Sequence, residues 1–343
     1  MAVLKIAYPV ILPFTIAVLL AFVFIPMIKT LNKIRCPRIL SIFIVIIIIA
    51  AGMSIFGMVL FSSGRMVVMQ MPNFEGRFKE IYDWMAEVFS LPNDEGLTFW
   101  QNLWGQEIIR NLVRDITISS SSTFFSFISI ALLVVLFAVF ILMEAGFFKE
   151  KLFVAFESQA GNIEGMGNEL VSQVTRYLTA KFLISFANGL IFVIAFSIIG
   201  LEFAVVWGVF QFLLNFIPTL GSITAGVIIS LFALLQFWPD PAPIILIVAI
   251  ILGVNMICNF LDPKIVGDHV GISPLVILVS LSLWGYIWGF AGMVLAVPMT
   301  VIIKIVCEHI PIMEPVSVLI GSRKSVLVKK AAKEKAESEE AQD

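Results

Sequence analysis

Four amide side chains stand out between residues 211 and 259 of a largely apolar sequence. Gln211 and Asn215 are four residues apart, and Asn255 and Asn259 repeat that spacing. Residues four apart lie on one face of an α-helix, so each pair is expected to present two amides to the same neighbour. Because each amide offers donors and an acceptor, the two pairs predict one pocket for a hydroxyl-rich solute. The structural alternative is hydrogen bonding between helices, which is common in membrane bundles.

Prolines and glycines interrupt the backbone around these amides. Pro218, Gly221 and Ser222 closely follow Asn215, and we expect them to contribute to the substrate-binding site. A bilayer tolerates broken backbone only where protein or a wet cavity satisfies the freed N–H and C=O groups, so such segments point to a transport site. The further residues expected to form hinges or hairpin turns are Pro263, Gly267, Gly285, Gly289, Gly292 and Pro298.

Two acidic residues are candidates for coupling transport to an ion. Asp262 lies three residues after Asn259, and Glu202 lies nine residues before Gln211. Charged groups within a membrane protein are costly and often functional. Asp262 can bind a cation or carry a proton, although the adjacent Lys264 also favours a simple surface pair. His269 with one acid falls short of the three or four convergent ligands of a metal site, so no metal is predicted.

The sequence lacks the motifs of the common enzyme classes. It contains no His-Glu-x-x-His, no glycine-rich phosphate loop with lysine and no Gly-x-Ser-x-Gly elbow. We therefore predict no catalytic residues, no cofactor and a function other than an enzyme.

Composition predicts an all-α, polytopic membrane protein. Of the 343 residues, 60% are hydrophobic and 13% charged, whereas a soluble domain has about 45–50% and about 25%. Several charge-free runs approach or exceed the roughly 20 apolar residues that a helix needs to span the bilayer. The basic residues lie at expected helix ends and in the tail, which argues against nucleic acid as a partner and for the lipid bilayer.

Changes in polarity divide the chain into five expected segments. The central segment, residues 122–201, contains membrane helices and a polar, helical, cytoplasmic stretch over 144–182. The others are the N-terminal membrane helices of a scaffold (1–61), an extracytoplasmic insertion of small amphipathic helices (62–121), a transport core with two hairpin motifs (202–310) and a polar cytoplasmic tail (311–343).

The transport core is expected to contain broken or re-entrant helical hairpins. Residues 273–288 and 290–304 are two apolar arms of roughly 23 Å each as helix, shorter than the roughly 30 Å hydrocarbon core. A hairpin turning at 289–292 fits better than two full spans. Residues 203–215 and 220–238 form a second pair of arms, which either re-enter or cross the membrane.

Basic residues set the expected orientation. The connector 29–38 holds four cations and no acid, so the positive-inside rule places it in the cytoplasm. If 144–182, 261–272 and 304–343 are also cytoplasmic, these segments contain most of the 22 Lys and Arg residues. The C-terminus is then cytoplasmic and the N-terminus external.

Taken together, the motifs resemble the autoinducer-2 exporter (AI-2E, PerM-like permease) family. The resemblance rests on residues 215–221, 259–267 and 284–298, with Ile11-Leu-Pro-Phe14 and Pro26 similar to the family's early helix. It extends over about residues 6–320. The 203–209 stretch, with Trp207-Gly208, and the 301–308 helix look closest to the branch that exports autoinducer-2.

The resemblance implies a multi-pass secondary transporter of the bacterial inner membrane. Its substrate would be autoinducer-2, a small furanone-type polyol, exported by an elevator-like alternating-access movement of a hairpin-bearing domain. The scaffold would be a homo-oligomer, pentameric by resemblance, and the driving ion H⁺ or Na⁺. Relatives commonly begin with another apolar helix, so this chain is expected to start inside the second.

Two alternatives stay open from the sequence. Other branches of the family behave as sodium/proton antiporters, and in that case Asp262 and Glu202 would carry the cation and proton. The second alternative is a membrane scaffold or sensor without transport activity, built around residues 62–121.

Overall fold

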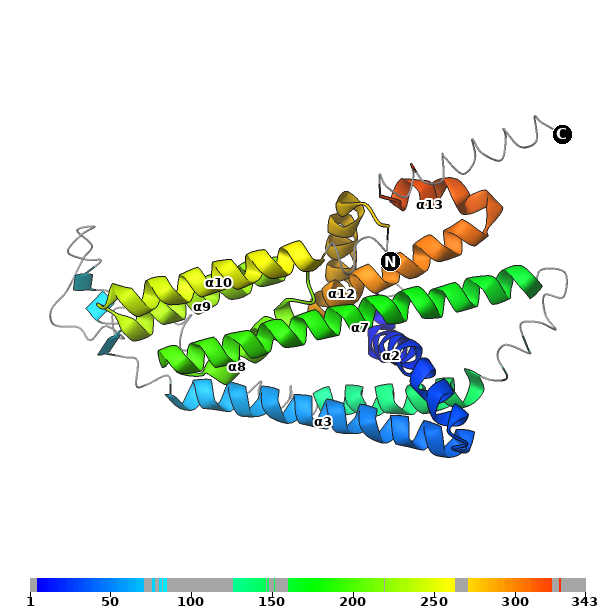
Figure 1. Cartoon of the computed structure of the whole chain (residues 1–343), viewed down its shortest axis with the longest axis horizontal. Helices are drawn as coiled ribbons and strands as arrows, with labels where there is room; N and C mark the ends of the chain where they lie inside the picture. Colours follow the sequence, from blue (N-terminus) through cyan, green and yellow to red (C-terminus); the bar gives the residue numbers. More distant parts are fainter. Residues whose placement is uncertain are drawn as a thin grey trace. The chain divides into compact units, whose positions relative to one another are not determined.

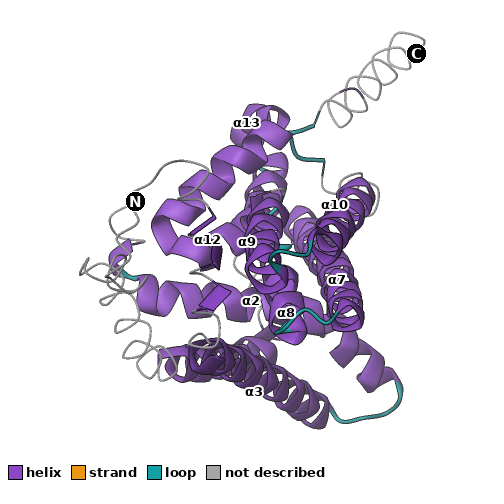
Figure 2. Ribbon diagram, turned by 90° about the vertical axis from the view of Figure 1, so that its left-hand side faces the viewer, coloured by secondary structure: helices purple, strands orange, loops and turns teal. Residues whose placement is uncertain are grey.

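The described part of the chain is helical. The structure is a computed structural model, and it describes residues 5–70, 76–77, 80–81, 83–84, 126–145, 147, 151, 160–218, 220–262, 271–322 and 327. Within these ranges the one β-type pairing is an isolated antiparallel bridge, Ile272–Gly321, and Figure 2 draws helices throughout. Seven of the described helices are long and apolar enough to cross a membrane. The prediction of a polytopic all-α membrane protein is confirmed.

Parts of the sequence-based expectations lie outside the described residues. They include most of the 62–121 insertion, most of the 311–343 tail, and Pro263 and Gly267. The helices that matter below are α2 (Tyr8–Lys33), α3 (Arg38–Gln70), α7 (Ala160–Ile199), α8 (Ala204–Leu214), α9 (Leu220–Phe237), α10 (Pro241–Asp262), α12 (Pro274–His309) and α13 (Glu314–Ile320), drawn in Figure 1.

The chain divides into two compact units that each combine distant segments. The first unit comprises Met1–Ile49, Leu132–Ile184 and Phe260–Asp343, and the second comprises Ala50–Ala131 and Ser185–Asn259. Helix α7 runs without a break through residue 182, where the sequence predicted a polar segment to give way to a membrane span. A change in composition alone does not interrupt the hydrogen bonds of a helix, so the two predicted pieces form one.

In the first unit, α12 is a helical hairpin. Its backbone leaves the helical region at Gly289, with φ 61° and ψ −140°, a conformation that essentially only glycine adopts. Beyond the turn the second arm packs against the first, because the Ser280 hydroxyl lies 2.6 Å from the Thr300 hydroxyl and donates to the Ala296 carbonyl at 3.1 Å. The predicted hairpin in this segment is confirmed, and Figure 1 draws its two arms in brown-yellow and orange.

Side-chain contacts hold other helices of the first unit together. The Thr175 hydroxyl of α7 donates to the Phe22 carbonyl of α2 at 2.7 Å. Phe14 of α2 packs edge-to-face on Phe137, with ring centroids 5.6 Å apart. Phe137 belongs to the helix Ser126–Ala145. These few polar and aromatic contacts join helices whose outward faces are apolar, as expected in a bilayer.

In the second unit, α8 and α9 form another hairpin. At its base, Gln236 near the end of α9 donates to the Gly200 carbonyl at 2.9 Å and accepts from the Glu202 N–H at 2.8 Å. Phe203 and Trp207 pack on Phe232 of α9, with ring centroids 5.5 and 5.0 Å apart. The two ends of the hairpin therefore lie together, and residues 215–218 lie at its tip.

The tip of this hairpin reaches only part of the way along α7. Asn215 contacts Ser185 of α7, whereas the base contacts Gly200 just beyond the end of the same helix. Fifteen residues of helix span about 22 Å, less than the roughly 30 Å hydrocarbon core. With 11 residues, α8 is itself too short to cross, whereas α9, with 18 residues, is long and apolar enough to do so.

Candidate functional site

The amide cluster lies near the tip of the α8–α9 hairpin. We define it as Ser185 and Asn188 of α7, Gln211 and Asn215 of the α8 segment, and Asn255 of α10. Gln211 and Asn188 are 0% exposed and Asn215 is 3% exposed. All five belong to the second unit. The structure thus brings three of the four predicted amides together, while the side chain of Asn259 lies outside the described residues.

A chain of hydrogen bonds links three helices and fixes how the amides point. Gln211 Nε2 donates to Asn255 Oδ1 at 2.8 Å, and Asn255 Nδ2 donates to the Ser222 backbone carbonyl at 3.4 Å. A backbone carbonyl can only accept, so the Asn255 nitrogen must face Ser222 and its oxygen must face Gln211. Gln211 therefore presents its own oxygen, Oε1, to the remaining space.

A second contact joins the tip to α7 where α7 and α8 lie closest. We call this contact region, between residues 185–189 of α7 and 208–215 of the α8 segment, the α7–α8 seam. Asn215 Nδ2 donates to the Ser185 hydroxyl at 2.9 Å. One turn along α7, a Cβ on Gly189 would lie 2.7 Å from the Gly208 carbonyl and 3.0 Å from Phe212 Cβ. Glycine on both helices is what allows backbones to approach this closely.

Several polar atoms of the cluster have no hydrogen-bond partner. Within the described residues these are both amide atoms of Asn188 and Oε1 of Gln211, together with Nε1 of Trp207. More than nine in ten buried polar groups in proteins are paired with protein or water, so an unpaired group needs an explanation. Trp207 packs on the aromatic side chains of α9, whereas the free groups of Asn188 and Gln211 belong to the α7–α8 seam.

The tip itself is a tight turn that depends on Gly221. A Cβ at this residue would lie 1.7 Å from the Leu214 carbonyl oxygen. The Gly221 N–H donates to the Ile217 carbonyl at 3.2 Å, and the Leu220 N–H to the Pro218 carbonyl at 2.7 Å. Ser222 contributes its backbone carbonyl to the cluster through Asn255. The predicted residues Pro218, Gly221 and Ser222 therefore build the turn that holds the amides.

Of the two predicted ion-coupling acids, Glu202 lies away from the cluster. Glu202 is exposed at the base of the hairpin, at the end opposite the tip. Asp262 is the last residue of α10, and its side chain lies outside the described residues. The described members of the cluster carry neutral amide and hydroxyl groups. No group of three or more potential metal ligands occurs among the described residues.

The predicted hinge residues of the first unit lie in the α12 hairpin. Gly289 forms its turn, and Gly285 and Gly292 lie at the facing arms, where a Cβ on Gly292 would be 1.9 Å from the Trp284 carbonyl oxygen. The ring of Trp284 packs against that of Trp288 at a tilt, with ring centroids 4.9 Å apart. Pro298 is buried inside the helical second arm and does not break it.

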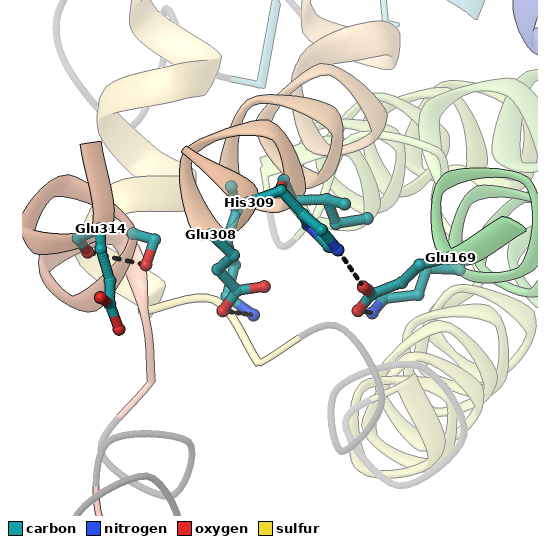
Figure 3. A network of polar contacts seen from close by, with 8 residues as sticks. Glu169, Glu308, His309 and Glu314 are labelled. Carbon is teal, nitrogen blue, oxygen red and sulfur yellow. Dashed lines mark hydrogen bonds and ion pairs between the residues drawn. The ribbon is translucent and has the colours of Figure 1, made fainter. Parts of the chain in front are cut away.

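A polar network surrounds the end of that second arm (Figure 3). His309 Nε2 lies 3.6 Å from Glu169 Oε2 of α7, and its Nδ1 lies 3.0 Å from the Ile305 carbonyl. Lys304 and Glu308 form an ion pair at 3.5 Å one turn earlier. The two ring nitrogens of His309 thus face a carboxylate of α7 and a backbone carbonyl of α12, and the first of these contacts links the two helices.

Sequence reasoning missed two members of the cluster, Ser185 and Asn188. They are three residues apart on the apolar stretch of α7, four and seven residues after Lys181. That spacing puts all three on one helix face. A polar face in an otherwise apolar span was therefore the signal that could have found them.

Comparison with known proteins gives a consistent result over nearly the whole chain. A family model described as "AI-2E family transporter" matches residues 1–312. The chain is 28% identical over 319 residues to a Borreliella burgdorferi protein named "Putative transport protein", covering 92% of this chain and 86% of that protein. It is 27% identical over 328 residues to the "AI-2 transport protein TqsA" of Escherichia coli, covering 93% and 91%.

Proposed function

Since the chain belongs to the AI-2E transporter family, we propose that it carries a small, neutral, polar solute across the bacterial inner membrane. The first candidate for this solute is autoinducer-2. The observation that carries the proposal is the buried Gln211 amide, whose oxygen is unpaired while its nitrogen is held by Asn255. The name of the E. coli relative, "AI-2 transport protein TqsA", supports the choice of solute.

The chemistry of the amide cluster supports a polyhydroxylated ligand. Amides pair with hydroxyl groups as donors and as acceptors, and the side chains of the cluster that the structure describes are all neutral. Autoinducer-2 is a small polyol and offers several such hydroxyls. The residues we propose to bind it are Gln211, Asn215 and Asn255, with Asn259 one turn further along α10.

The hairpin gives this site a place within the membrane. The tip of the α8–α9 hairpin lies about 22 Å from its base, measured along α7. The cluster at the tip would therefore lie deep in the hydrocarbon, as binding sites of secondary transporters do. We propose that the solute moves outward by alternating access, driven by an ion gradient, with the hairpin as a moving part in an elevator-like step within a homo-oligomer.

Replacing Gln211 by leucine is expected to lower autoinducer-2 transport strongly. The substitution keeps the side-chain volume and removes one free acceptor and one donor, together worth roughly 2 kcal/mol, or a factor of about 30 in apparent affinity. The measurement is uptake or release of labelled autoinducer-2 by proteoliposomes that contain the purified full-length protein, with flux followed against solute concentration.

Gln236→Leu is the matched control for this experiment. Gln236 is also a hydrogen-bonded glutamine of the hairpin, but it lies at the base. We expect its replacement to lower thermal stability modestly and to leave the apparent affinity for autoinducer-2 unchanged. Equal losses of affinity in the two variants would contradict a binding site at the tip, and absence of flux in the unmodified protein would contradict the proposed solute.

A further inference from the structure

Asn188 is a buried amide whose hydrogen-bonding groups are all unused. Its side chain is 0% exposed, and neither Oδ1 nor Nδ2 has a partner within the described residues. Burying an unpaired amide destabilises a protein, whereas an apolar residue of similar size at the same position would not. The amide is therefore unfavourable for folding alone, which suggests that it serves a ligand.

The contacts on either side of Asn188 place it in the seam between α7 and α8. Ser185, three residues earlier, bonds Asn215 at the tip. Gly189, the next residue, packs against Gly208 and Phe212 of α8. Because residues three apart share a helix face, Asn188 lies on the same side of α7 as Ser185, whose partner on the hairpin is Asn215.

Gln211 occupies the corresponding level of α8. It lies three residues after Gly208 and four before Asn215, the two α8-side residues that contact α7 at either end of the seam. Its nitrogen is taken by Asn255, so the group it leaves free is the acceptor Oε1. The seam thus holds one fixed acceptor on α8 and one amide with both donor and acceptor on α7.

We propose that Asn188 and Gln211 together bind a hydroxyl group of a neutral solute, and that Asn188 is a specificity-determining residue of the transport site. A hydroxyl can donate its hydrogen to Gln211 Oε1 while its oxygen accepts from Asn188 Nδ2, which pairs two of the three free groups, and Asn188 Oδ1 can accept from a second hydroxyl of the same solute. A carboxylate has no hydrogen to give to Gln211 Oε1. A metal cation or an ammonium group would leave the Asn188 donor unpaired.

This inference rests on the proposed function, and its first test separates a binding role from a structural one. The Asn188→Leu variant is expected to raise the KM of autoinducer-2 flux in proteoliposomes by about tenfold or more, the loss expected for one or two hydrogen bonds. Its Tm should stay equal to that of the unmodified protein or rise, since an unpaired buried amide is removed.

Phe192→Leu serves as the control for this flux measurement. Phe192 is equally buried and lies one turn further along α7. Its replacement should lower Tm and leave KM unchanged. If Asn188→Leu raises Tm while KM stays within twofold of the unmodified protein, the amide holds only a water molecule and the proposal is overturned. A lower Tm with unchanged KM overturns it as well.

A second test does not depend on autoinducer-2 being the solute. The three native cysteines are replaced by alanine, and Asn188→Cys and Phe192→Cys are made separately in the full chain. Membrane vesicles are then treated with a small, water-soluble methanethiosulfonate. A seam that admits polar solutes should allow the Asn188→Cys thiol to react at least about tenfold faster than the Phe192→Cys thiol, since the reaction needs an accessible thiolate.

Equal, slow reaction of the two thiols would show that no polar solute reaches the seam and would overturn the inference. Faster reaction of the Asn188→Cys thiol, in a protein that transports no autoinducer-2, would instead leave the hydroxyl site in place and show that the solute was wrongly chosen. The thiol test also decides the matter if Asn188→Leu does not fold.

Discussion

Replacing Gly221 by alanine is expected to disrupt the α8–α9 hairpin and to abolish transport. The added Cβ would lie 1.7 Å from the Leu214 carbonyl oxygen and 2.6 Å from the carbonyl carbon, both backbone atoms that cannot rotate away. Forcing such an overlap costs on the order of 3 kcal/mol and moves the tip that carries Asn215 and Ser222. We expect Tm of the purified protein to fall by roughly 5 °C or more, with no measurable solute flux.

Gly253→Ala provides the control for this substitution. Gly253 is also a helical glycine of the second unit, on α10, and a Cβ there meets nothing within 4 Å. Alanine is favoured over glycine in a helix by up to about 1 kcal/mol, so Tm should stay constant or rise and flux should be retained. If Gly221→Ala behaves like Gly253→Ala, the tight turn at the tip is not as described.

The hairpin of α12 could be predicted from the sequence because two independent signals agree. The arms expected from the sequence, 273–288 and 290–304, are shorter than a full span, and glycines gather at their junction. For α8 and α9, the sequence located the two arms, 203–215 and 220–238, close to the observed helices, the first of which ends at Leu214, but it left open whether they re-enter or cross the membrane. The close approach of Gly221 to the Leu214 carbonyl makes the chain turn there.

The amide cluster was only half predictable. The four-residue spacing predicts that Gln211 and Asn215 share one face of α8. In the structure both side chains are buried and hydrogen-bonded to other helices. Which helix each amide contacts depends on packing between segments about 30 to 44 residues apart, as for Asn215 with Ser185 and Gln211 with Asn255. Local periodicity contains no information on such pairings, so Asn188, a single amide in an apolar run, was interpreted as part of a span.

The two hairpins use the same device at their turns. In each, a glycine of the second arm packs against a backbone carbonyl of the first: Gly221 against Leu214, and Gly292 against Trp284. The close approach shortens the turn, so the arms can stay antiparallel without a long polar loop. A long loop at membrane depth would leave backbone groups without partners, which the bilayer does not tolerate. The two glycines therefore allow a short turn, and a short turn leaves few backbone groups unpaired within the membrane.

Replacing Gly292 by alanine is accordingly expected to open the α12 hairpin. The new Cβ would lie 1.9 Å from the Trp284 carbonyl oxygen and 3.1 Å from Trp288 Cβ. The second arm must therefore move away from the first, which disturbs the packed rings of Trp284 and Trp288. We expect a loss of about 3 kcal/mol, read as a lower Tm and a change in tryptophan fluorescence.

Gly289→Ala should cost less, about 1–3 kcal/mol, because its Cβ meets nothing within 4 Å and the penalty comes from the positive φ alone. Gly165→Ala on α7, also without a neighbour within 4 Å, should leave Tm unchanged. A smaller fall in Tm for Gly292→Ala than for Gly289→Ala would contradict a steric contact between the arms as the feature that closes this hairpin.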